Sequence, residues 1–242
     1  MKINNAIFDV GANNGLDGLG FALLNPHYNI YAFEANPELI SEIKKNKKKI
    51  EFFFKLELKN YEIINKAISD FNGTADFHVS QFNLCSSLLR YKFVKTKKKI
   101  TSDVITLENF CIQNNIDNII HLHVDTQGSD ISVIKGLKSY RKKVHSGVME
   151  TIVKKKDILY KGGSSYDQVI SLFNQWNFKI IKTEFNNFEK KEINVYFLNN
   201  LIHKNKLLKF NRFKKRFINR IIENKTNTKD YFYMKYLKLF RL

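Results

Sequence analysis

The sequence predicts an α/β fold with a mostly parallel sheet that ends in a C-terminal antiparallel hairpin strand. Strand-like and helix-like segments alternate through the first 200 residues. Helical stretches separate most of the strand-like segments, as parallel neighbours require, because a parallel pair needs a long crossover connection. Only the polar stretch 186–192 separates the last two strand-like segments, which favours antiparallel pairing of these two.

Short apolar runs and turn residues define the elements of the first half of the chain. The apolar run 6–10 ends at Gly11, the run 29–33 ends at Glu34, and Pro37 suits the first turn of a helix. The predicted elements are, in order, strand 6–10, helix 16–24, strand 29–33, helix 37–48, strand 61–64, a turn at 71–74 and an alternating, strand-like segment 75–79.

In the second half, continuous apolar runs predict buried strands, and apolar positions at helical spacing predict helices. The predicted elements are, in order, helix 107–115, strand 119–124, helix 129–140, strand 144–149, helix 166–176 and the final strands 178–183 and 193–198. Because helices lie between most of the strands, we expect them to cover both faces of the sheet.

The composition excludes two classes of protein. Of the 242 residues, 43% are hydrophobic, which is enough for a packed core and excludes a wholly disordered chain. No apolar run approaches the ~18 residues of a membrane-spanning helix, so we expect neither a signal peptide nor a membrane anchor. Cys85 and Cys111 match no metal-binding spacing and cannot form a disulfide framework. We therefore expect a soluble, cytoplasmic protein.

Positive charge is concentrated at the C-terminus. The net charge is +18, with 35 Lys and only 6 Arg. Residues 201–242 carry 13 of these basic residues against Glu223 and Asp230, a net charge of +11, which leaves +7 for the first 200 residues. We therefore predict one domain over residues 1–200 and a basic amphipathic extension over residues 201–242.

Three roles stay open for the extension. Apolar residues between Phe210 and Ile221 recur at three- and four-residue steps, which predicts one face of a helix. This helix could dock on the sheet, or it could lie on an anionic membrane surface and make the protein peripheral to the membrane. Nucleic acid is a disfavoured partner, because no recognised binding module is present and arginine is scarce.

A glycine turn follows the first strand. Asp9 lies near the end of the strand, and Gly11 and Gly15 lead into the helix 16–24 in a Gly-x-x-x-Gly pattern. Such glycines let a ligand approach the backbone, and the helix N-terminus offers unpaired N–H groups. The dinucleotide pattern Gly-x-Gly-x-x-Gly seats a pyrophosphate, which a carboxylate would repel. Asp9 would suit a cationic sulfonium, so the pattern favours S-adenosylmethionine over NAD, with an ordinary strand-to-helix turn as the alternative.

A second acidic residue follows the second strand. Glu34 lies 19 residues after Gly15, where an acid in Rossmann-type sites accepts hydrogen bonds from ribose hydroxyls. In this register, Asp9, Gly11, Gly15 and Glu34 predict one cofactor pocket.

Four motifs occur in order along the chain, at residues 8–15 (FDVGANNG), 32–37 (AFEANP), 65–73 (NKAISDFNG) and 124–128 (VDTQG). Together they resemble the FkbM family of methyltransferases, and the resemblance runs from about Ala6 to Leu198. The resemblance implies a Rossmann-like methyltransferase fold that uses S-adenosylmethionine. It also implies methyl transfer to a hydroxyl, with a sugar, polysaccharide or related glycoconjugate as the favoured acceptor.

The resemblance further implies which residues contact the cofactor. Ala67 and Ile68 would lie near the adenine, and Asp125 near the reacting methyl group. The full set implied in this way is Asp9, Gly11, Ala12, Asn13, Gly15, Glu34, Ala35, Asn36, Ala67, Ile68 and Asp125.

Three residues are candidates for catalysis. Asp125 and Glu150 end neighbouring predicted strands, so both should face the crevice at the carboxyl ends of the sheet. Either could take the proton of an acceptor hydroxyl, and His123, alone or with Asp125, is a further candidate base. The alternatives are a helix cap for Asp125, an ion pair with Lys154 for Glu150 and a buried, neutral side chain for His123.

Other interpretations stay open beside these. His121, His123 and Asp125 share a strand face, where a divalent metal is possible but is not predicted. The loop 160–166 either covers the substrate or only connects two elements. The alternative function is a non-catalytic protein on a Rossmann scaffold that binds nucleic acid or a membrane surface.

Overall fold

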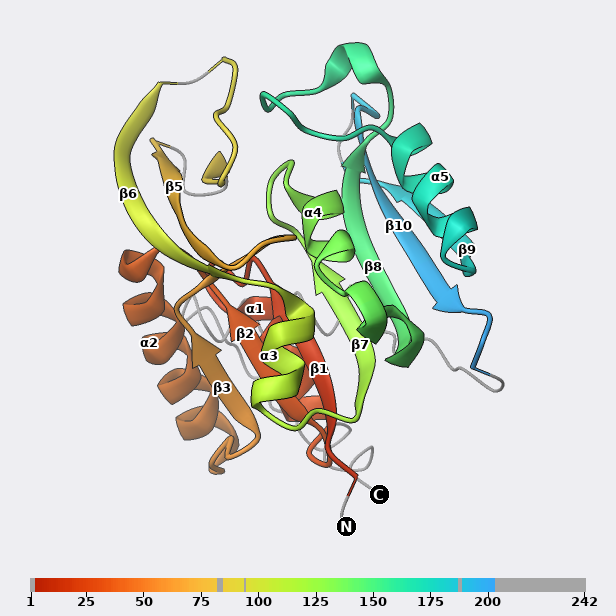
Figure 1. The fold of residues 1–242 in the computed structure, drawn as a ribbon. Coiled ribbons are helices and arrows are strands. Elements are labelled where there is room, and N and C mark those ends of the chain that lie inside the picture. The colour runs from red at the N-terminus through yellow and green to blue at the C-terminus, as the bar shows by residue number, and fades with distance from the viewer. Residues whose placement is uncertain (1–2, 82–84, 94, 187–188, 203–242) are drawn as a thin grey trace.

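Strand β1 (Asn5–Val10) lies at the centre of the fold. It pairs in parallel with β2 (Asn29–Phe33) on one side and with β7 (Asn118–Val124) on the other (Figure 1). This computed structural model describes residues 3–81, 85–93, 95–186 and 189–202. Apolar and buried residues dominate all three strands, as expected of strands that are covered on both faces.

The central sheet has seven strands in the order β3-β2-β1-β7-β8-β10-β9. Its outer members are β3 (Tyr61–Ile64), β8 (Val144–Ile152), β9 (Phe178–Phe185) and β10 (Glu192–Asn199). The five neighbouring strands β3, β2, β1, β7 and β8 are parallel, whereas β10 is antiparallel to both of its neighbours, β8 and β9. The predicted α/β class and the antiparallel final hairpin are therefore confirmed.

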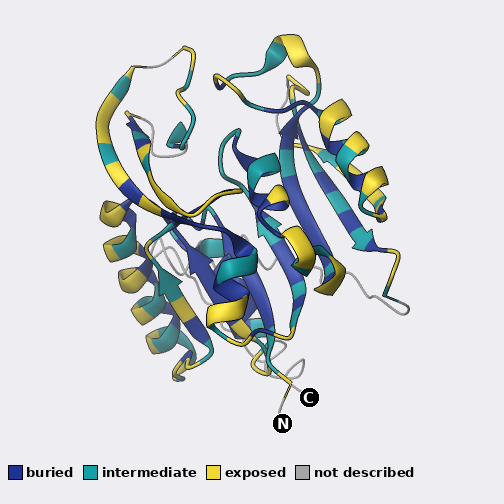
Figure 2. Cartoon of the chain, viewed as in Figure 1, coloured by how far each residue is buried: buried dark blue, intermediate teal, exposed yellow. Residues whose placement is uncertain are grey.

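Helices cover both faces of this sheet, and successive side chains of β1 point to opposite faces. Ile7 packs in a cluster with the apolar side chains of one pair of helices, and Phe8 packs with those of the other three. The first pair is α1 (Leu16–Leu24) and α2 (Pro37–Phe54), and the other three are α3 (Leu107–Gln113), α4 (Asp130–Lys135) and α5 (Tyr166–Gln175). Figure 2 shows the strands between these layers as the buried part of the molecule.

A second, smaller sheet lies beside the carboxyl ends of the central strands. It contains β4 (Ala67–Ile68), β5 (Gly73–Ser80) and β6 (Thr96–Ile105) in the order β4-β6-β5. The sequence did not predict β6, because its first half is a lysine-rich, exposed stretch without an apolar alternation. Phe77, Val79 and Val104 from this sheet pack against Ala35, which follows β2, and against Ala67.

Two predicted helices differ from their predicted bounds by more than two residues. Helix α2 continues past the predicted end at Lys48 to Phe54, and Lys55 ends it in the left-handed conformation. The predicted helix 129–140 is split into α4 and the 3-10 helix η2 (Lys138–Lys143). Gly136 lies at the break, where a Cβ atom would be 2.2 Å from the carbonyl oxygen of Ser69. Close packing against the β4 region therefore ends α4 early.

The predicted basic extension, residues 201–242, lies outside the described residues from residue 203 onward. Its division from the first 200 residues stays a prediction. Among the helices that the structure describes, none is long and apolar enough to cross a membrane.

Substitution of Gly11 should destabilise the protein more than substitution of Gly162. The two glycines have nearly the same left-handed backbone, with φ of +84° and +82°, so alanine costs about 1–2 kcal/mol at either position. A Cβ atom at Gly11 would also lie 1.9 Å from the carbonyl oxygen of Asp125, whereas at Gly162 the nearest atom is 3.9 Å away. We expect Gly11→Ala to lower the free energy of unfolding in urea by about 1–3 kcal/mol more than Gly162→Ala. Equal losses would contradict this.

Candidate functional site

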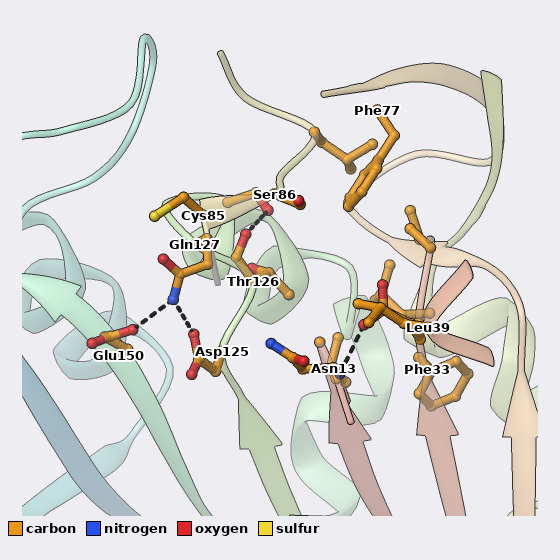
Figure 3. Close-up of a pocket in the computed structure, with 18 of the residues that line it drawn as sticks. Asn13, Phe33, Leu39, Phe77, Cys85, Ser86, Asp125, Thr126, Gln127 and Glu150 are labelled. Carbon is orange, nitrogen blue, oxygen red and sulfur yellow. Dashed lines mark hydrogen bonds between the residues drawn. The ribbon is translucent and has the colours of Figure 1, made fainter. Parts of the chain in front are cut away.

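A cavity of about 380 Å³ opens at the carboxyl ends of the central strands. Side chains and backbone that follow β1, β2, β7 and β8 form its floor, and residues of the small sheet and of the β5–β6 connection complete its wall (Figure 3). Open α/β sheets bind ligands at this edge. The described part of the chain thus holds a candidate site where the sequence places one.

The turn after β1 fits closely between its two neighbouring strands. Gly11 and Ala12 donate their backbone N–H groups to the carbonyl oxygen of Phe33, at 3.0 and 2.9 Å. On the other side, Gly11 touches the backbone of Asp125, where there is no room for a Cβ atom. Gly11 therefore brings the ends of β1, β2 and β7 together, and Asn13 follows on the cavity wall.

Glu34 lies on the cavity wall with both carboxylate oxygens bonded to the backbone. The oxygens accept hydrogen bonds from the N–H groups of Asn13 and Asn36, each at 2.8 Å. Burial raises the pKa of Glu34 to about 7, although these N–H groups act in the opposite direction. Because a carboxylate has about four acceptor positions, Glu34 can still accept hydrogen bonds from the hydroxyls of a ligand.

Asp9 does not line the cavity, so the structure gives no support to its predicted contact with the cofactor. The side chain is 1% exposed, and its Oδ2 atom accepts a hydrogen bond from the backbone N–H of Gly18 in the first turn of α1. Its Oδ1 atom lies 2.8 Å from Nδ1 of His123. Asp9 therefore joins the start of α1 to β7 beneath the cavity.

His123 is likewise held beneath the cavity and does not line it, so the structure gives no support to its predicted role as a base. His121 is fully buried and lies 2.9 Å from the hydroxyl of Ser146. Burial lowers the pKa of His121 to about 3, which keeps its ring neutral. Among the described residues, no group of three His, Cys, Asp or Glu side chains could hold a metal ion.

The remaining predicted residues divide into those that line the cavity and those that support it. Ala12, Gly15 and Asn36 do not line it, and Asn36 instead caps α2 by accepting a hydrogen bond from Glu38. The predicted residues that line the cavity are Gly11, Asn13, Glu34, Ala35, Ala67, Ile68, Asp125 and Glu150.

Sequence reasoning missed several lining residues. Phe77 lies on β5, Leu88 lies in the β5–β6 connection, and Leu39 lies in the first turn of α2. The alternating pattern 75–79 could have indicated an inward Phe77, but nothing local shows that this strand reaches the cavity. Gln127 belongs to the motif at residues 124–128, but only the structure shows the contacts of its side chain.

At one end of the cavity, Asp125 and Glu150 share an amide group (Figure 3). Nε2 of Gln127 donates to Oδ1 of Asp125 at 2.6 Å and to Oε2 of Glu150 at 3.2 Å. Burial, and then the nearby Asp125, raise the pKa of Glu150 to about 9. Glu150 therefore keeps its proton at neutral pH. Asn186 also contacts Glu150.

The loop 160–166 lies beside this pair. The Tyr160 hydroxyl donates to Oε1 of Gln127 at 3.0 Å, and the Tyr160 ring packs in an edge-to-face contact with Tyr91 of the β5–β6 connection. The backbones of the two segments also bond to each other, from Lys92 to Leu159 and from Lys161 to Arg90. The loop is thus joined to the carboxyl pair and to the β5–β6 connection.

The family model of the methyltransferase FkbM domain matches residues 9–180, which is more than half of the chain. The chain belongs to the FkbM methyltransferase family. The matched residues include most of the cavity wall, from Val10 to Glu150. The predicted membership of a methyltransferase family is thereby confirmed, and the alternative of a non-catalytic binding protein is not favoured.

The chain is also similar to a curated methyltransferase and to a solved structure. The 2-O-methyltransferase NoeI of Sinorhizobium fredii (strain NBRC 101917 / NGR234) is 27% identical over 151 residues, which cover 57% of this chain and 59% of that protein. The chain thus spans less than two thirds of this relative. The crystal structure of methyltransferase FkbM from Methylobacillus flagellatus KT matches with a TM-score of 0.52 and 11% identity, over 80% of this chain and 43% of that one. The second match shows a shared fold.

Substitution of Asp9 should lower the stability of the fold, because its side chain joins α1 to β7 beneath the cavity. Asp9→Ala leaves the buried N–H of Gly18 and the ring of His123 without their carboxylate. We expect the free energy of unfolding in urea to fall by about 1–3 kcal/mol. The exposed pair of Asp76 with Lys99 offers a control, since Asp76→Ala should change stability by less than about 1 kcal/mol. An Asp9→Ala protein as stable as the control would contradict this.

Cofactor affinity should depend on pH through Glu34. Ligand hydroxyls donate to the ionised carboxylate, so below its pKa of about 7 binding must first remove a proton. The dissociation constant of S-adenosylhomocysteine, measured by calorimetry, should therefore rise by up to about tenfold per pH unit below pH 7 and level off above about pH 8. Glu34→Gln should bind more weakly and lose most of this slope. If the pH dependence of the dissociation constant is unchanged in Glu34→Gln, other groups cause it.

Proposed function

We propose that this chain transfers a methyl group from S-adenosylmethionine to a hydroxyl oxygen of a carbohydrate. One observation carries the proposal: a single cavity holds Glu34 at the end of β2 and the Asp125–Glu150 pair at the ends of β7 and β8. The first carboxylate suits the ribose of a cofactor, and the second group suits proton transfer.

The residues present fit the cofactor in three parts. Apolar atoms of Ala67, Ile68 and Phe77 line the wall near Glu34 and suit a flat adenine ring. Glu34 would accept the ribose hydroxyls, for which its carboxylate keeps free acceptor positions. Asp125 lies across the glycine turn from Glu34 and would face the positive charge of the sulfonium. When bound, the cofactor supplies an electrophilic methyl group.

The acceptor reaction releases one proton, and the carboxyl pair can take it. The hydroxyl oxygen forms a bond to the methyl carbon while the carbon–sulfur bond breaks, and the electron pair of that bond stays on sulfur. The hydroxyl proton goes to the pair, which carries one negative charge when it holds one proton. Holding the nucleophile in line with the methyl group supplies much of the catalysis, and a positioned base adds about 10²–10⁴-fold.

Oxygen is the proposed acceptor atom for two reasons. The name of the relative NoeI specifies 2-O-methyl transfer. The cavity wall also carries polar groups, among them Ser86, Gln127 and Glu192. Such a wall suits a ligand with several hydroxyls, as a sugar has. The choice of a sugar over another alcohol rests on the family resemblance.

Asp125→Asn should reduce methyl transfer while leaving the affinity for S-adenosylhomocysteine, which lacks the sulfonium charge, nearly unchanged. The amide keeps the shape of the side chain but cannot take the proton of the hydroxyl. With radiolabelled S-adenosylmethionine and a panel of mono- and oligosaccharides, we expect turnover to fall by about 10²–10⁴-fold. The calorimetric affinity for S-adenosylhomocysteine should change by less than about tenfold.

The exposed Asp76→Asn serves as the matched control and should retain full turnover. Failure of the unsubstituted protein to bind S-adenosylhomocysteine at millimolar concentration would remove the proposal. Equal losses of turnover and affinity in Asp125→Asn would instead assign Asp125 to cofactor contact.

A further inference from the structure

Gln127 uses its whole side-chain amide at the carboxyl pair. Its two N–H groups point to Asp125 and Glu150, and its oxygen accepts the hydrogen bond of Tyr160. Figure 3 shows the amide between the two carboxyl groups at one end of the cavity. The Gln127 backbone is left-handed, with φ of +56°, an uncommon conformation for a residue other than glycine. The turn after β7 is therefore shaped so that this side chain returns over the strand ends.

The chemistry of the partners fixes the orientation of this amide. When the pair holds one proton, one of its carboxyl groups is ionised and only accepts hydrogen bonds, so it favours the NH₂ group of Gln127. Burial raises the pKa of Tyr160, which keeps its hydroxyl protonated and able to donate. A flipped amide would place its oxygen against the carboxyl oxygens. The Tyr160 hydroxyl opposes this flip, because it donates to the oxygen in the observed orientation.

Tyr160 is itself held in place by its neighbours. It is 3% exposed, and its ring covers Gly128 so closely that a Cβ atom there would lie 2.7 Å from a ring carbon. Tyr91 packs on its other side, with 4.9 Å between the ring centroids. The hydroxyl therefore reaches Gln127 from a fixed position, although Tyr160 does not itself line the large cavity.

We propose that Gln127, held in one amide orientation by the Tyr160 hydroxyl, is the positioning residue that keeps the Asp125 and Glu150 carboxyl groups together at the acceptor end of the cavity. Tyr160 acts through Gln127 and does not need to touch the acceptor. The inference rests on the proposed function for its catalytic meaning. The contacts themselves are independent of that function.

Other ionisable groups also face the pair and must stay unchanged in any test. Asp130 of α4 raises the pKa of Glu150 further, Glu192 of β10 lies on the same cavity wall, and Cys85 lies there from the β5–β6 connection. A variant at Gln127 leaves these three in place, whereas Tyr160→Phe also removes the contact of its hydroxyl with Cys85. A change in the titration of the pair in a Gln127 variant would then report the loss of the amide contact.

The test measures the titration of the pair directly in the full chain. Carbon-13 NMR of side-chain carboxyl groups, assigned with Glu150→Gln, would follow the upper titration step of the pair. The raised pKa of Glu150, about 9, is the value expected for this step in the unsubstituted protein. Gln127→Met keeps the length of the side chain and removes the donor. Because the ionised pair then loses a hydrogen bond, the upper step should rise by about one pH unit. Tyr160→Phe should raise it in the same direction.

The double variant decides whether Tyr160 acts through Gln127. If it does, Tyr160→Phe adds nothing to Gln127→Met, and the two shifts are not additive. Tyr91→Phe is the matched control, since it keeps the ring contact with Tyr160, and it should leave the upper step unchanged. In the methyl-transfer assay, Tyr160→Phe should lower kcat about tenfold with an unchanged KM for S-adenosylmethionine.

Two results would overturn the inference. One is an upper step that stays at its original position in Gln127→Met. The other is additive shifts in the double variant, because Tyr160 would then act by another route. If Tyr160→Phe fails to fold, Gln127→Met alone still tests the role of the amide. Failure to bind S-adenosylhomocysteine would refute the proposed function, whereas the NMR titration would still decide the role of Gln127.

Discussion

The contact between Gly11 and the backbone of Asp125 sets the geometry on which the cavity depends. Strands β1 and β7 approach so closely at this point that no Cβ atom fits between them. The same turn bonds to Phe33 at the end of β2. Side chains that are far apart in the sequence, such as Asn13, Glu34 and Asp125, are therefore brought to one cavity by a few backbone contacts. A residue larger than glycine would separate the strand ends.

Acidic side chains gather at the cavity of a chain whose overall charge is positive. The chain carries a net charge of +18, yet at or beside the cavity Glu34 and Asp130 are buried and Glu150 is half-buried, and burial raises the pKa of each. Desolvation of these acids costs free energy in the absence of a ligand. A cationic ligand would lower that cost, so the cavity is complementary to positive charge in a way that the surface is not.

The central strands could be predicted from the sequence because continuous apolar runs suffice to define strands buried on both faces. Strand β6 could not, because its exposed lysines give no apolar pattern and its pairing with β5 decides its conformation. Strand parity could have corrected the prediction for Asp9. Asp9 and Ile7 share one face of β1, which packs beneath α1, whereas Glu34 follows the end of β2 and is free of that constraint.

The contacts of Gln127 show a different limit of sequence reasoning. The motif at 124–128 indicates a ligand site, but no local pattern tells that an amide will lie between carboxyl groups from two strands. That arrangement depends on the pairing of β7 with β8 and on the approach of Tyr160, which are both tertiary.

The position of β10 in the sheet has a consequence for how the chain folds as it is synthesised. β10 is the last strand of the described chain, yet it lies inside the sheet and bonds to β8 and β9. Until about residue 199 leaves the ribosome, β8 has an open edge on that side, and β9 has no partner. Such unpaired edges can associate with other chains. The nascent protein therefore has a period of exposure to aggregation that ends when β10 pairs with β8 and β9.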